Sequence, residues 1–136
     1  MGTVYAEITL KNTKDVLFAN SGAIKDQDVR QTKVRAMVDT GAGTLIITEA
    51  IQQKLGLELL EERPVRLADR TIRVCRYAEP VEIYWKDRYS TIRPMVLAGS
   101  EEVLLGAIPL QDMDLIVDPA RHELIGAHGD KIVHRV

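Results

Sequence analysis

Asp39 is the residue of this chain whose setting is best suited to chemistry. The apolar residues Ala36 to Val38 precede it, and a second apolar run, Leu45 to Ile47, follows shortly after. A carboxylate between two apolar strands lies near the core, where it is costly unless it is hydrogen-bonded. Gly41 lets backbone N–H groups approach the carboxylate, and the Thr40 hydroxyl can donate or accept in the same loop. The pattern predicts a carboxylate held rigidly at the bottom of a cleft.

Hydrolysis of a peptide bond by carboxylates needs two of them. Two close carboxylates that share a proton can activate water and protonate the carbonyl oxygen, because like charges split their pKa values. The tripeptide Asp-Thr-Gly occurs once in the chain, so a second copy must supply the other carboxylate. A twofold axis would place Asp39 opposite its own symmetry mate, and the pair would titrate as one unit. This chemistry predicts a homodimer that acts on a peptide or protein substrate without metal or cofactor.

Short strands and one helix are predicted to position this carboxylate. Val34 to Val38 is an apolar strand that leads into it, and Leu45 to Ile47 is a short buried strand after it. Thr48 to Leu55 is predicted to be a helix, because Thr48 suits the N-cap and Gly56 is a natural C-terminal stop. The chemistry-bearing loop is therefore expected between two strands of one sheet.

Strands are predicted along the rest of the chain from alternating or continuous apolar patterns. Val4 to Leu10 alternates, and the polar residues 11–32 predict a long excursion with a short helix, in which Val16 to Phe18 could pack locally. The remaining elements are a hairpin of Val65–Leu67 with Ile72–Val74, a hairpin of Val81–Trp85 with Tyr89–Val96, a strand at Val103–Leu105, one or two helical turns at Ile108–Met113, and a final pair of Leu115–Val117 with His122–Ile125. Together they predict one mostly β domain over residues 1–136, closed or strongly curved into a barrel.

Composition excludes several classes of protein. Hydrophobic residues make up 46% and aromatic residues only 4%, so Val, Ile and Leu must build the core. The net charge of -2 does not predict the positively charged surface that nucleic-acid binding needs. No apolar run approaches the roughly 20 residues that a membrane span needs. Cys75 is the one cysteine, which favours a reducing compartment, so a cytoplasmic location without membrane or nucleic-acid partners is expected.

The chain resembles the retropepsin-like aspartic peptidases (clan AA), in the bacterial and cellular type with a single Asp-Thr-Gly motif. The family pattern places apolar residues, Asp-Thr-Gly-Ala and a short apolar strand in that order, as in Ala36 to Ala42 followed by Leu45 to Ile47. Many members continue with a helix that ends in Leu-Gly-Leu, here Leu55 to Leu57. The second family signature, two apolar residues and a glycine, matches Leu104 to Gly106.

The resemblance implies a closed retropepsin-like barrel, a homodimeric aspartic endopeptidase and a role for each matched residue. Asp39 would be catalytic, and Thr40, Gly41, Ala42 and Gly106 would support its loop. The flap and cleft residues that would bind substrate are Leu67, Ala68, Asp69, Arg70, Ile72, Met37 and Leu104. The strand Leu115 to Val117 would help to build the dimer sheet.

Three departures from the viral members leave alternatives open. Ala107 stands where viral members have an arginine, and Gly43 and Thr44 stand where they have acidic residues. The flap tip is Asp69-Arg70 in place of glycines, which would favour polar or acidic substrate positions or cover the cleft less well. The alternative functions are a weak or inactive dimer that binds extended peptides by strand addition, and a structural domain of a larger assembly.

Several of these residues also have a purely structural interpretation. Met37, Leu67, Ile72 and Leu104 fit a plain core as well as they fit substrate pockets. The histidines of the C-terminal region recur at intervals that neither helix nor strand brings onto one metal ion, and the nearby aspartates are predicted to be solvated turn residues. These residues are His122, His128, His134, Asp112, Asp114 and Asp118.

Overall fold

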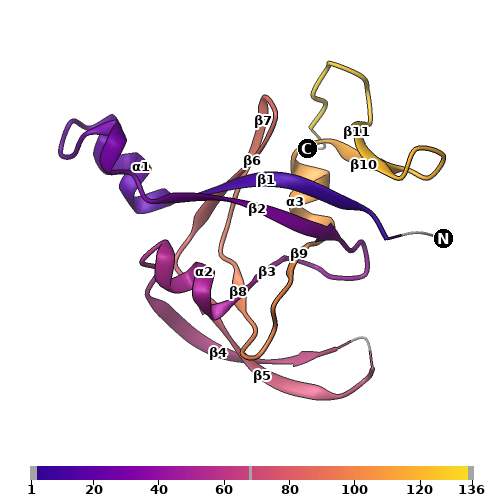
Figure 1. Ribbon diagram of the computed structural model, residues 1–136, viewed down its shortest axis with the longest axis horizontal. Helices are drawn as coiled ribbons and strands as arrows, with labels where there is room; N and C mark the ends of the chain where they lie inside the picture. Colours follow the sequence, from indigo (N-terminus) through magenta and orange to yellow (C-terminus); the bar gives the residue numbers. More distant parts are fainter. Residues whose placement is uncertain (1–2, 68, 135–136) are drawn as a thin grey trace.

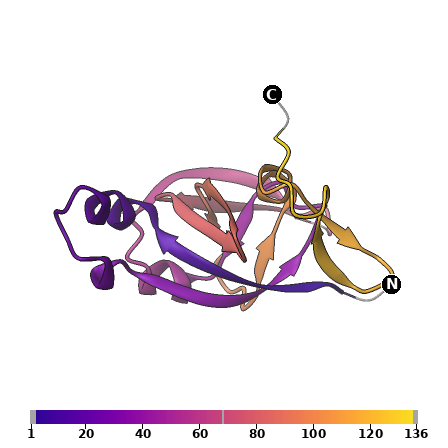
Figure 2. The same ribbon diagram turned by 90° about the horizontal axis from the view of Figure 1, so that it is seen from above.

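One long curled sheet carries most of the chain (Figures 1 and 2). The computed structural model describes residues 3–67 and 69–134. In that part of the chain the sheet has the strand order β4-β5-β8-β3-β9-β2-β1-β6-β7, and β10 and β11 form a separate two-stranded sheet. The strands are β1 (Tyr5–Asn12), β2 (Gln31–Val38), β3 (Leu45–Ile47), β4 (Leu59–Arg66), β5 (Ile72–Ala78), β6 (Val81–Trp85), β7 (Arg88–Ile92), β8 (Met95–Val96), β9 (Val103–Leu105), β10 (Leu115–Asp118) and β11 (Glu123–Gly126).

The mostly β, strongly curved fold predicted from the sequence is confirmed, but the barrel is open. The large sheet ends at β4 on one side and at β7 on the other, and no pairing between these two strands is present among the described residues. The sheet is thus a curled half-barrel. Its core is aliphatic, as the low aromatic content predicts, and the fully buried side chains include Ile8, Leu10, Leu45, Ile47, Leu55, Ile83 and Leu105.

In residues 3–67 and 69–134, three α-helices and one short 3-10 helix lie in the connections between strands. They are α1 (Thr13–Asn20), η1 (Asp26–Asp28), α2 (Glu49–Lys54) and α3 (Ala107–Asp112). The predicted helix after the Asp39 loop is confirmed as α2, whose N-cap Thr48 accepts a hydrogen bond on its hydroxyl from the Ile51 N–H at 3.2 Å. Gly56 ends α2 with φ of 64°, a left-handed conformation that glycine adopts without strain. The helical turns predicted near residue 108 are confirmed as α3.

The excursion between β1 and β2 protrudes from one end of the molecule (Figure 1). It is clasped at its base, where the carboxylate of Asp15 accepts hydrogen bonds from the backbone N–H of Arg30 at 3.0 Å and from its guanidinium at 2.8 and 2.9 Å. The predicted local packing of Val16 to Phe18 is wrong for Leu17 and Phe18, which are both exposed. The clasp is polar, so α1 holds its place without burying that apolar pair.

Proline divides the strand predicted from Tyr89 to Val96. Pro94 has no N–H to donate to a ladder, and the chain changes partners there: β7 pairs with β6, whereas β8 pairs with β3 and β5. The carbonyl of Pro94 still accepts a hydrogen bond from the Ala78 N–H at 2.9 Å. This change of partners lets the chain pass from one side of the half-barrel to the other.

A buried arginine joins the C-terminal segment to the body of the molecule. Arg88, at the start of β7, donates from its guanidinium to the carbonyl oxygens of Met113 at 2.9 Å, Asp114 at 2.8 Å and Gly129. One side chain therefore holds together β7, the end of α3 and the loop after β11. No helix in the described part of the chain is both long and apolar enough to cross a membrane.

Asp114 differs from its prediction as a solvated turn residue. It is buried, and its carboxylate lies 2.7 Å from the ring Nδ1 of His128 and accepts a hydrogen bond from the Val133 N–H at 3.0 Å. The hydrogen bond from His128 lowers the pKa of Asp114 below its ordinary value. The sequence shows only an aspartate after a helix, and the returning C-terminal segment supplies its partners.

Candidate active site

Asp39 follows the last residue of β2 and begins the loop that joins β2 to β3. Its backbone N–H donates to the Leu105 carbonyl in β9 at 3.0 Å, and its carbonyl accepts from the Ala42 N–H at 3.1 Å. Its carboxylate oxygen Oδ1 accepts from the Gly41 N–H at 2.9 Å. The side chain is half-buried, so the carboxylate is oriented from within the loop and still reaches solvent.

Strand β9 and the start of α3 hold the Asp39 loop in place through backbone hydrogen bonds. Strand β9 lies between β2 and β3, parallel to β2 and antiparallel to β3. Beyond it, the Ala107 N–H donates to the Ala42 carbonyl at 2.8 Å, and the Ile108 N–H donates to the Gly43 carbonyl at 3.0 Å. Ala107, where viral members have an arginine, thus holds the loop through its backbone.

Gly106 lies where β9 and α3 come closest to the Asp39 loop. A Cβ atom added at this residue would stand 2.6 Å from the carbonyl oxygen of Ala42, and closer still to that of Thr44. Both are backbone atoms, so no side-chain rotation could relieve the overlap. The structure therefore requires glycine at this point if the loop and β9–α3 are to keep their contact.

Thr40 and Gly41 are exposed in the single chain, and Ala42 is half-buried. A Cβ atom added at Gly41 would stand 3.2 Å from Asp39 Oδ1, which is the oxygen that the Gly41 N–H binds. The glycine thus allows the short approach of backbone to carboxylate that the sequence predicts.

Met37 and Leu104, two of the predicted pocket residues, lie opposite each other beside Asp39. They are register partners in the β2–β9 pair, and both are half-buried. Partners in a sheet share a face, and the pairing continues from Leu104 to Ile46, from Ile46 to Met95 and from Met95 to Tyr77. We call the sheet face that bears Met37, Ile46, Met95, Leu104 and Tyr77 the Met37 face.

The predicted flap hairpin is present as β4 and β5, joined by a tight turn. The Leu67 N–H donates to the Thr71 carbonyl at 2.9 Å, and the Arg70 N–H donates to the Leu67 carbonyl at 2.9 Å. Ala68, also predicted to bind substrate, lies outside the described residues. In Figures 1 and 2 the turn and the Asp39 loop lie toward the same end of the molecule.

Asp69 and Arg70 give the turn its shape. The Asp69 carboxylate accepts from both the backbone N–H and the hydroxyl of Thr71, at 3.0 and 2.6 Å. The side-chain hydrogen bond from Thr71 lowers the pKa of Asp69. Arg70 has φ of 69°, a left-handed conformation that is strained for a residue with a side chain. The aspartate therefore compensates for the missing glycines by fixing the turn with its own carboxylate.

Leu67 and Ile72 do not share the environment predicted for them. Leu67 is half-buried, whereas Ile72 is 63% exposed. Ile72 is therefore not a core residue. The strand register separates the two residues. Leu67 follows the alternation of Val65, whose register partner is Arg73, whereas the register partner of Ile72 is Arg66, on the opposite side of the hairpin.

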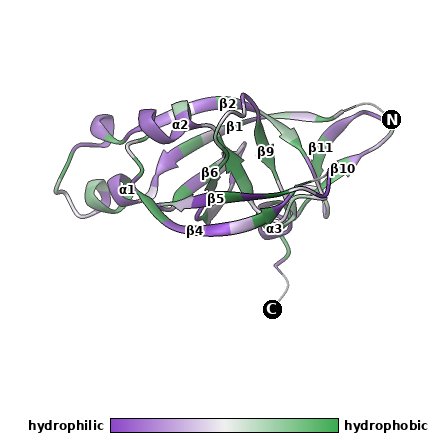
Figure 3. Ribbon diagram, turned by 90° about the horizontal axis from the view of Figure 1, so that it is seen from below, coloured by the Kyte–Doolittle hydropathy of each residue, from purple (hydrophilic) through white to green (hydrophobic). Residues whose placement is uncertain are grey.

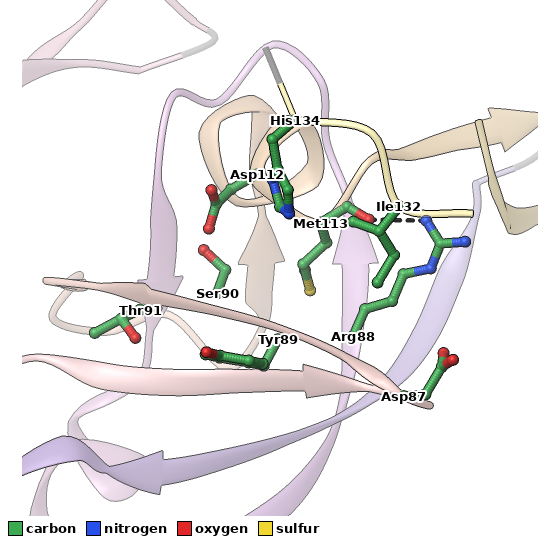
Figure 4. Close-up of a pocket in the computed structure, with 9 residues that line it drawn as sticks. All are labelled: Asp87, Arg88, Tyr89, Ser90, Thr91, Asp112, Met113, Ile132 and His134. Atoms are coloured by element: carbon green, nitrogen blue, oxygen red, sulfur yellow. Dashed lines mark hydrogen bonds between the residues drawn. The ribbon is translucent and has the colours of Figure 1, made fainter. Parts of the chain in front are cut away.

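Three cavities of the single chain have no Asp39 in their lining. A cavity of about 360 Å³ lies between β7 and the end of α3, lined by Ser90, Asp112, Met113 and His134 among others (Figure 4). A second cavity borders β1, β6 and β11, and a third borders α1, η1, β6 and β7, with Tyr84 in the lining of both. Within residues 3–67 and 69–134, no three His, Cys, Asp or Glu side chains are grouped as metal ligands would be.

The backbone groups that hold the Asp39 loop were not identified from the sequence. They are the Leu105 carbonyl and the Ala107 and Ile108 N–H groups, and backbone groups leave no mark on residue type. In the sequence only Gly106 indicates this contact, because the absence of a side chain there lets β9 and α3 approach the backbone of the Asp39 loop. The predicted site residues Asp39 to Ala42, Met37, Leu104 and Gly106 are thus brought together, while Leu67, Asp69, Arg70 and Ile72 lie on the separate hairpin.

Comparison with known proteins identifies one family. The model of the family described as "gag-polyprotein putative aspartyl protease" matches residues 26–112, more than half of the chain. The search of the curated proteins finds no match.

Solved structures show a related fold. The retroviral protease-like domain of Ddi1 from Leishmania major aligns over 100% of this chain and 95% of its own, with a TM-score of 0.59 at 14% identity, which supports a shared fold alone. A retropepsin-like aspartic protease from Rickettsia conorii aligns over 87% of this chain and 89% of its own, with a TM-score of 0.47 at 21% identity. The EIAV protease complexed with the inhibitor HBY-793 aligns over 60% and 77%, with a TM-score of 0.48 at 26% identity.

Proposed function

Since the chain belongs to the gag-polyprotein aspartyl protease family, we propose that it is an aspartic endopeptidase whose active site forms between two copies of the chain. Family membership confirms the resemblance to the retropepsin-like aspartic peptidases that the residues around Asp39 and Gly106 indicate. The observation that carries the proposal is the single, rigidly held, half-buried carboxylate of Asp39. It needs a second carboxylate to perform the chemistry, and a twofold axis supplies it.

In the proposed mechanism the two Asp39 side chains share one proton. The ionised carboxylate takes a proton from water as the water oxygen attacks the peptide carbonyl carbon, and the protonated one gives its proton to the carbonyl oxygen. In the tetrahedral intermediate the Asp39 that took the water proton gives it to the amide nitrogen, while the other Asp39 takes a proton from one hydroxyl group. The C–N bond then breaks, an amine and a carboxylic acid leave, and the pair again shares one proton. Charge stabilisation and proton transfer thus come from the same pair, and no step needs a metal.

The loop geometry supports this assignment. With Oδ1 held by the Gly41 N–H at 2.9 Å, the carboxylate keeps one orientation through the proton transfers, which lowers the reorganisation needed during reaction. Exposure of Thr40 and Gly41 in the single chain leaves them free to contact the partner copy across the axis. We assign Thr40 to fixing the two loops together, and Gly41 and Ala42 to the floor of the cleft.

A second group of residues is assigned to substrate. Met37 and Leu104 would line side-chain pockets on the Met37 face next to Asp39, and the β4–β5 hairpin would close over an extended peptide as a flap. Leu67, Asp69 and Arg70 would then approach the peptide from the hairpin side. The cytoplasm is the proposed location, as the lone Cys75 favours a reducing compartment.

The β10–β11 sheet is the proposed dimer contact. These strands pair with each other outside the large sheet, and a two-stranded sheet alone is marginally stable. Ile116 on β10 is 48% exposed. In Figures 1 and 2 this sheet lies toward the same end of the molecule as the Asp39 loop, so pairing through it would bring two such loops close together.

Peptide cleavage by the wild type and by Asp39→Asn tests the mechanism. The substitution keeps the shape of the side chain but removes the acid–base pair, so kcat/KM should fall by about 10²- to 10⁴-fold, the usual contribution of a positioned acid–base group. Asp28→Asn, on the exposed η1 helix, is the matched control and should cleave like the wild type.

Mixing the wild type with Asp39→Asn tests whether two copies share one active site. Adding Asp39→Asn in increasing excess to the wild type should suppress cleavage as mixed dimers replace wild-type dimers, and Asp28→Asn should not. Undiminished cleavage by the Asp39→Asn protein would show that the mechanism is wrong. Undiminished cleavage in the mixture, with subunit exchange verified, would show that each chain works alone.

One observation favours the alternative of a dimer that binds extended peptides without cutting them. The turn of the β4–β5 hairpin is fixed by Asp69 and has no glycine among its described residues, so it would open and close less readily than a glycine-rich flap. Peptide binding by the wild type without cleavage between pH 4 and 8 would support this alternative.

A further inference from the structure

The outer half of the β4–β5 hairpin concentrates positive charge in an acidic protein. Between residues 63 and 76 the chain has five arginines and one carboxylate, Asp69, while the whole chain has a net charge of -2. The arginines are Arg63, Arg66, Arg70, Arg73 and Arg76, and all five are exposed. In Figure 3 hydrophilic segments interrupt β4, whereas the central strand β9 is hydrophobic.

The strand register sorts two of these arginines onto the Met37 face. Tyr77 belongs to that face through its partner Met95, and alternation along β5 carries the same face through Cys75 to Arg73. Arg63 is the register partner of Cys75 on β4, so it shares this face. Arg63 and Arg73 are therefore diagonal neighbours on the face that continues to Met37 and Leu104 beside Asp39.

Arg66 lies on the opposite face of the same hairpin. Its register partner is Ile72, one residue out of phase with Arg73. Ile72 is 63% exposed, although the same face continues along β5 to Arg76, the register partner of the buried Val96. The hairpin therefore carries arginines on both faces, and only the face of Arg63 and Arg73 continues to Met37 and Leu104 beside Asp39.

The guanidinium groups on the Met37 face form no close ion pair with a carboxylate in the described part of the chain, although Glu61 lies near Arg63 and Asp69 lies near Arg73. Arg73 donates to the backbone carbonyl of Ala98, in the loop between β8 and β9, at 2.9 Å, and a carbonyl leaves the positive charge uncompensated. No ion pair of Arg63 or Arg73 is present among the described residues. Asp69, the nearby carboxylate, is occupied with Thr71.

We propose that Arg63 and Arg73 select peptide substrates with acidic side chains near the cleaved bond. The inference rests on the proposed function, because it assigns these residues to the substrate that Asp39 would cleave. The planar guanidinium forms paired hydrogen bonds with a carboxylate. A peptide held between the hairpin and the Asp39 loop would present alternate side chains to this face, so one or two acidic residues would meet the two arginines.

An acidic peptide fits these observations better than a nucleic acid does. The arginines occupy one short hairpin, and the rest of the chain carries the excess of negative charge, which repels a long polyanion. A peptide needs only a local match of charge.

Paired peptides test the proposal. A cleavable peptide found from a broad library is resynthesised with Glu or Gln at each position around the cleaved bond, and kcat/KM is measured at low and high salt. At the best position Glu should exceed Gln by about fivefold, the upper value for an exposed ion pair. The preference should shrink at high salt, because ions screen exposed charges.

Variants assign the preference to named residues. Arg63→Gln and Arg73→Gln should each lower the Glu-to-Gln ratio toward one, because cleavage of the Glu peptide should fall more than cleavage of the Gln peptide. Among the described residues the Arg63 side chain makes no hydrogen bond to the backbone. Arg63→Gln therefore controls for a movement of the β8–β9 loop in Arg73→Gln. Arg66→Gln removes the same charge from the opposite face and should keep the wild-type ratio.

The outcomes separate this proposal from the proposed function. Cleavage with equal rates for Glu and Gln at every position, or equal loss of preference in Arg66→Gln, would overturn the arginine assignment and leave the peptidase intact. If no peptide is cleaved, the affinities of the Asp39→Asn protein for the Glu and Gln library peptides test the proposal. Tighter binding of the Glu peptides that is lost in Arg63→Gln and Arg73→Gln supports the inference. Equal affinities, or preferential binding of a single-stranded oligonucleotide, overturn it.

Discussion

At the scale of single residues, the loop that carries Asp39 depends on the absence of side chains as much as on their presence. Gly41 permits a backbone N–H to reach the carboxylate at 2.9 Å, and Gly106 permits β9 and α3 to reach the backbone of the loop. The carboxylate would otherwise have to be oriented by flexible side chains, which hold a geometry less tightly than backbone groups do.

Gly106→Ala should therefore impair both stability and activity. The added methyl group would overlap the carbonyl oxygens of Ala42 and Thr44, and overpacking of this kind costs about 1–3 kcal/mol of unfolding free energy. The Asp39 loop would move to relieve the overlap, so kcat/KM for peptide cleavage should fall as well as the free energy of unfolding. Urea unfolding and peptide cleavage measure the two effects.

Gly43→Ala is the matched control within the same loop. A Cβ atom at Gly43 would meet nothing within 4 Å, so its unfolding free energy should stay within about 0.5 kcal/mol of the wild type. Similar losses in both variants would mean that glycine flexibility, not the close approach at Gly106, explains the effect.

At the scale of secondary-structure elements, α1 is fastened to the sheet by polar groups. The buried side chain of Asn12 donates to the Leu55 carbonyl at 2.8 Å and accepts from the Asp15 N–H at 3.1 Å. The carboxylate of Asp15 then receives three hydrogen bonds from Arg30. These contacts fix the excursion between β1 and β2 at its base, while its outer end exposes Leu17 and Phe18.

Asp15→Asn should destabilise the protein in a pH-dependent manner. Loss of charged hydrogen bonds to Arg30, whose side chain is 45% exposed and so partly screened, should cost about 1–2 kcal/mol near neutral pH. Hydrogen bonding from the Arg30 side chain lowers the pKa of Asp15 below its ordinary value. The stabilisation is therefore complete above about pH 5, where the unfolded aspartate is also ionised, and is lost as pH falls through the lowered pKa.

Chemical unfolding between pH 3 and 7 measures this difference. The gap between wild type and Asp15→Asn should be constant above pH 5 and should narrow below pH 4. Asp28→Asn, an exposed aspartate of the same excursion, should show no such gap. A difference that persists unchanged at the lowest pH would mean that packing, not the ion pair, accounts for the role of Asp15.

At the scale of the whole molecule, the two ends of the curled half-barrel carry different elements. One end bears α1 and η1, and the other gathers the Asp39 loop, the hairpin turn and the β10–β11 sheet (Figure 1). The proposed dimer uses the second end, which joins incomplete sites into one complete site. Asp39 is not in the lining of the three cavities described above.

Ile116→Asp should weaken the dimer without unfolding the chain. Ile116 is largely exposed on β10 in the single chain, so a charge there costs the monomer little, whereas it would be desolvated between two copies. The dimer dissociation constant should rise by about tenfold or more, and cleavage at low protein concentration should fall with it. Sedimentation velocity and activity against concentration measure both effects.

Leu17→Asp provides the control at the opposite end. Leu17 is also exposed, so its substitution should leave dimerisation and activity as in the wild type. A wild-type dimer in Ile116→Asp would remove β10 from the interface and direct attention to the loops around Asp39 and the hairpin.

The local elements could be predicted from the sequence because short-range forces decide them. Strand alternation predicts β1, the Thr48 cap and Gly56 define α2, and the paired apolar runs predict β10 and β11. The loop that carries Asp39 could also be predicted, since Gly41 and Gly106 allow close approach of the backbone. These signals lie in residue types and short spacings.

Only the tertiary structure decided which distant groups meet. The register across five strands places Arg73 on the same face as Met37 and leaves Ile72 on the other, although Arg73 and Ile72 are adjacent in the chain. The returning C-terminal segment covers Asp114, and at Pro94 the chain changes from pairing with β6 to pairing with β3 and β5. By itself, the sequence determined that one carboxylate would be held by a glycine-rich loop between strands. Long-range pairing, which depends on contacts between residues far apart in the chain, decided what surrounds that carboxylate.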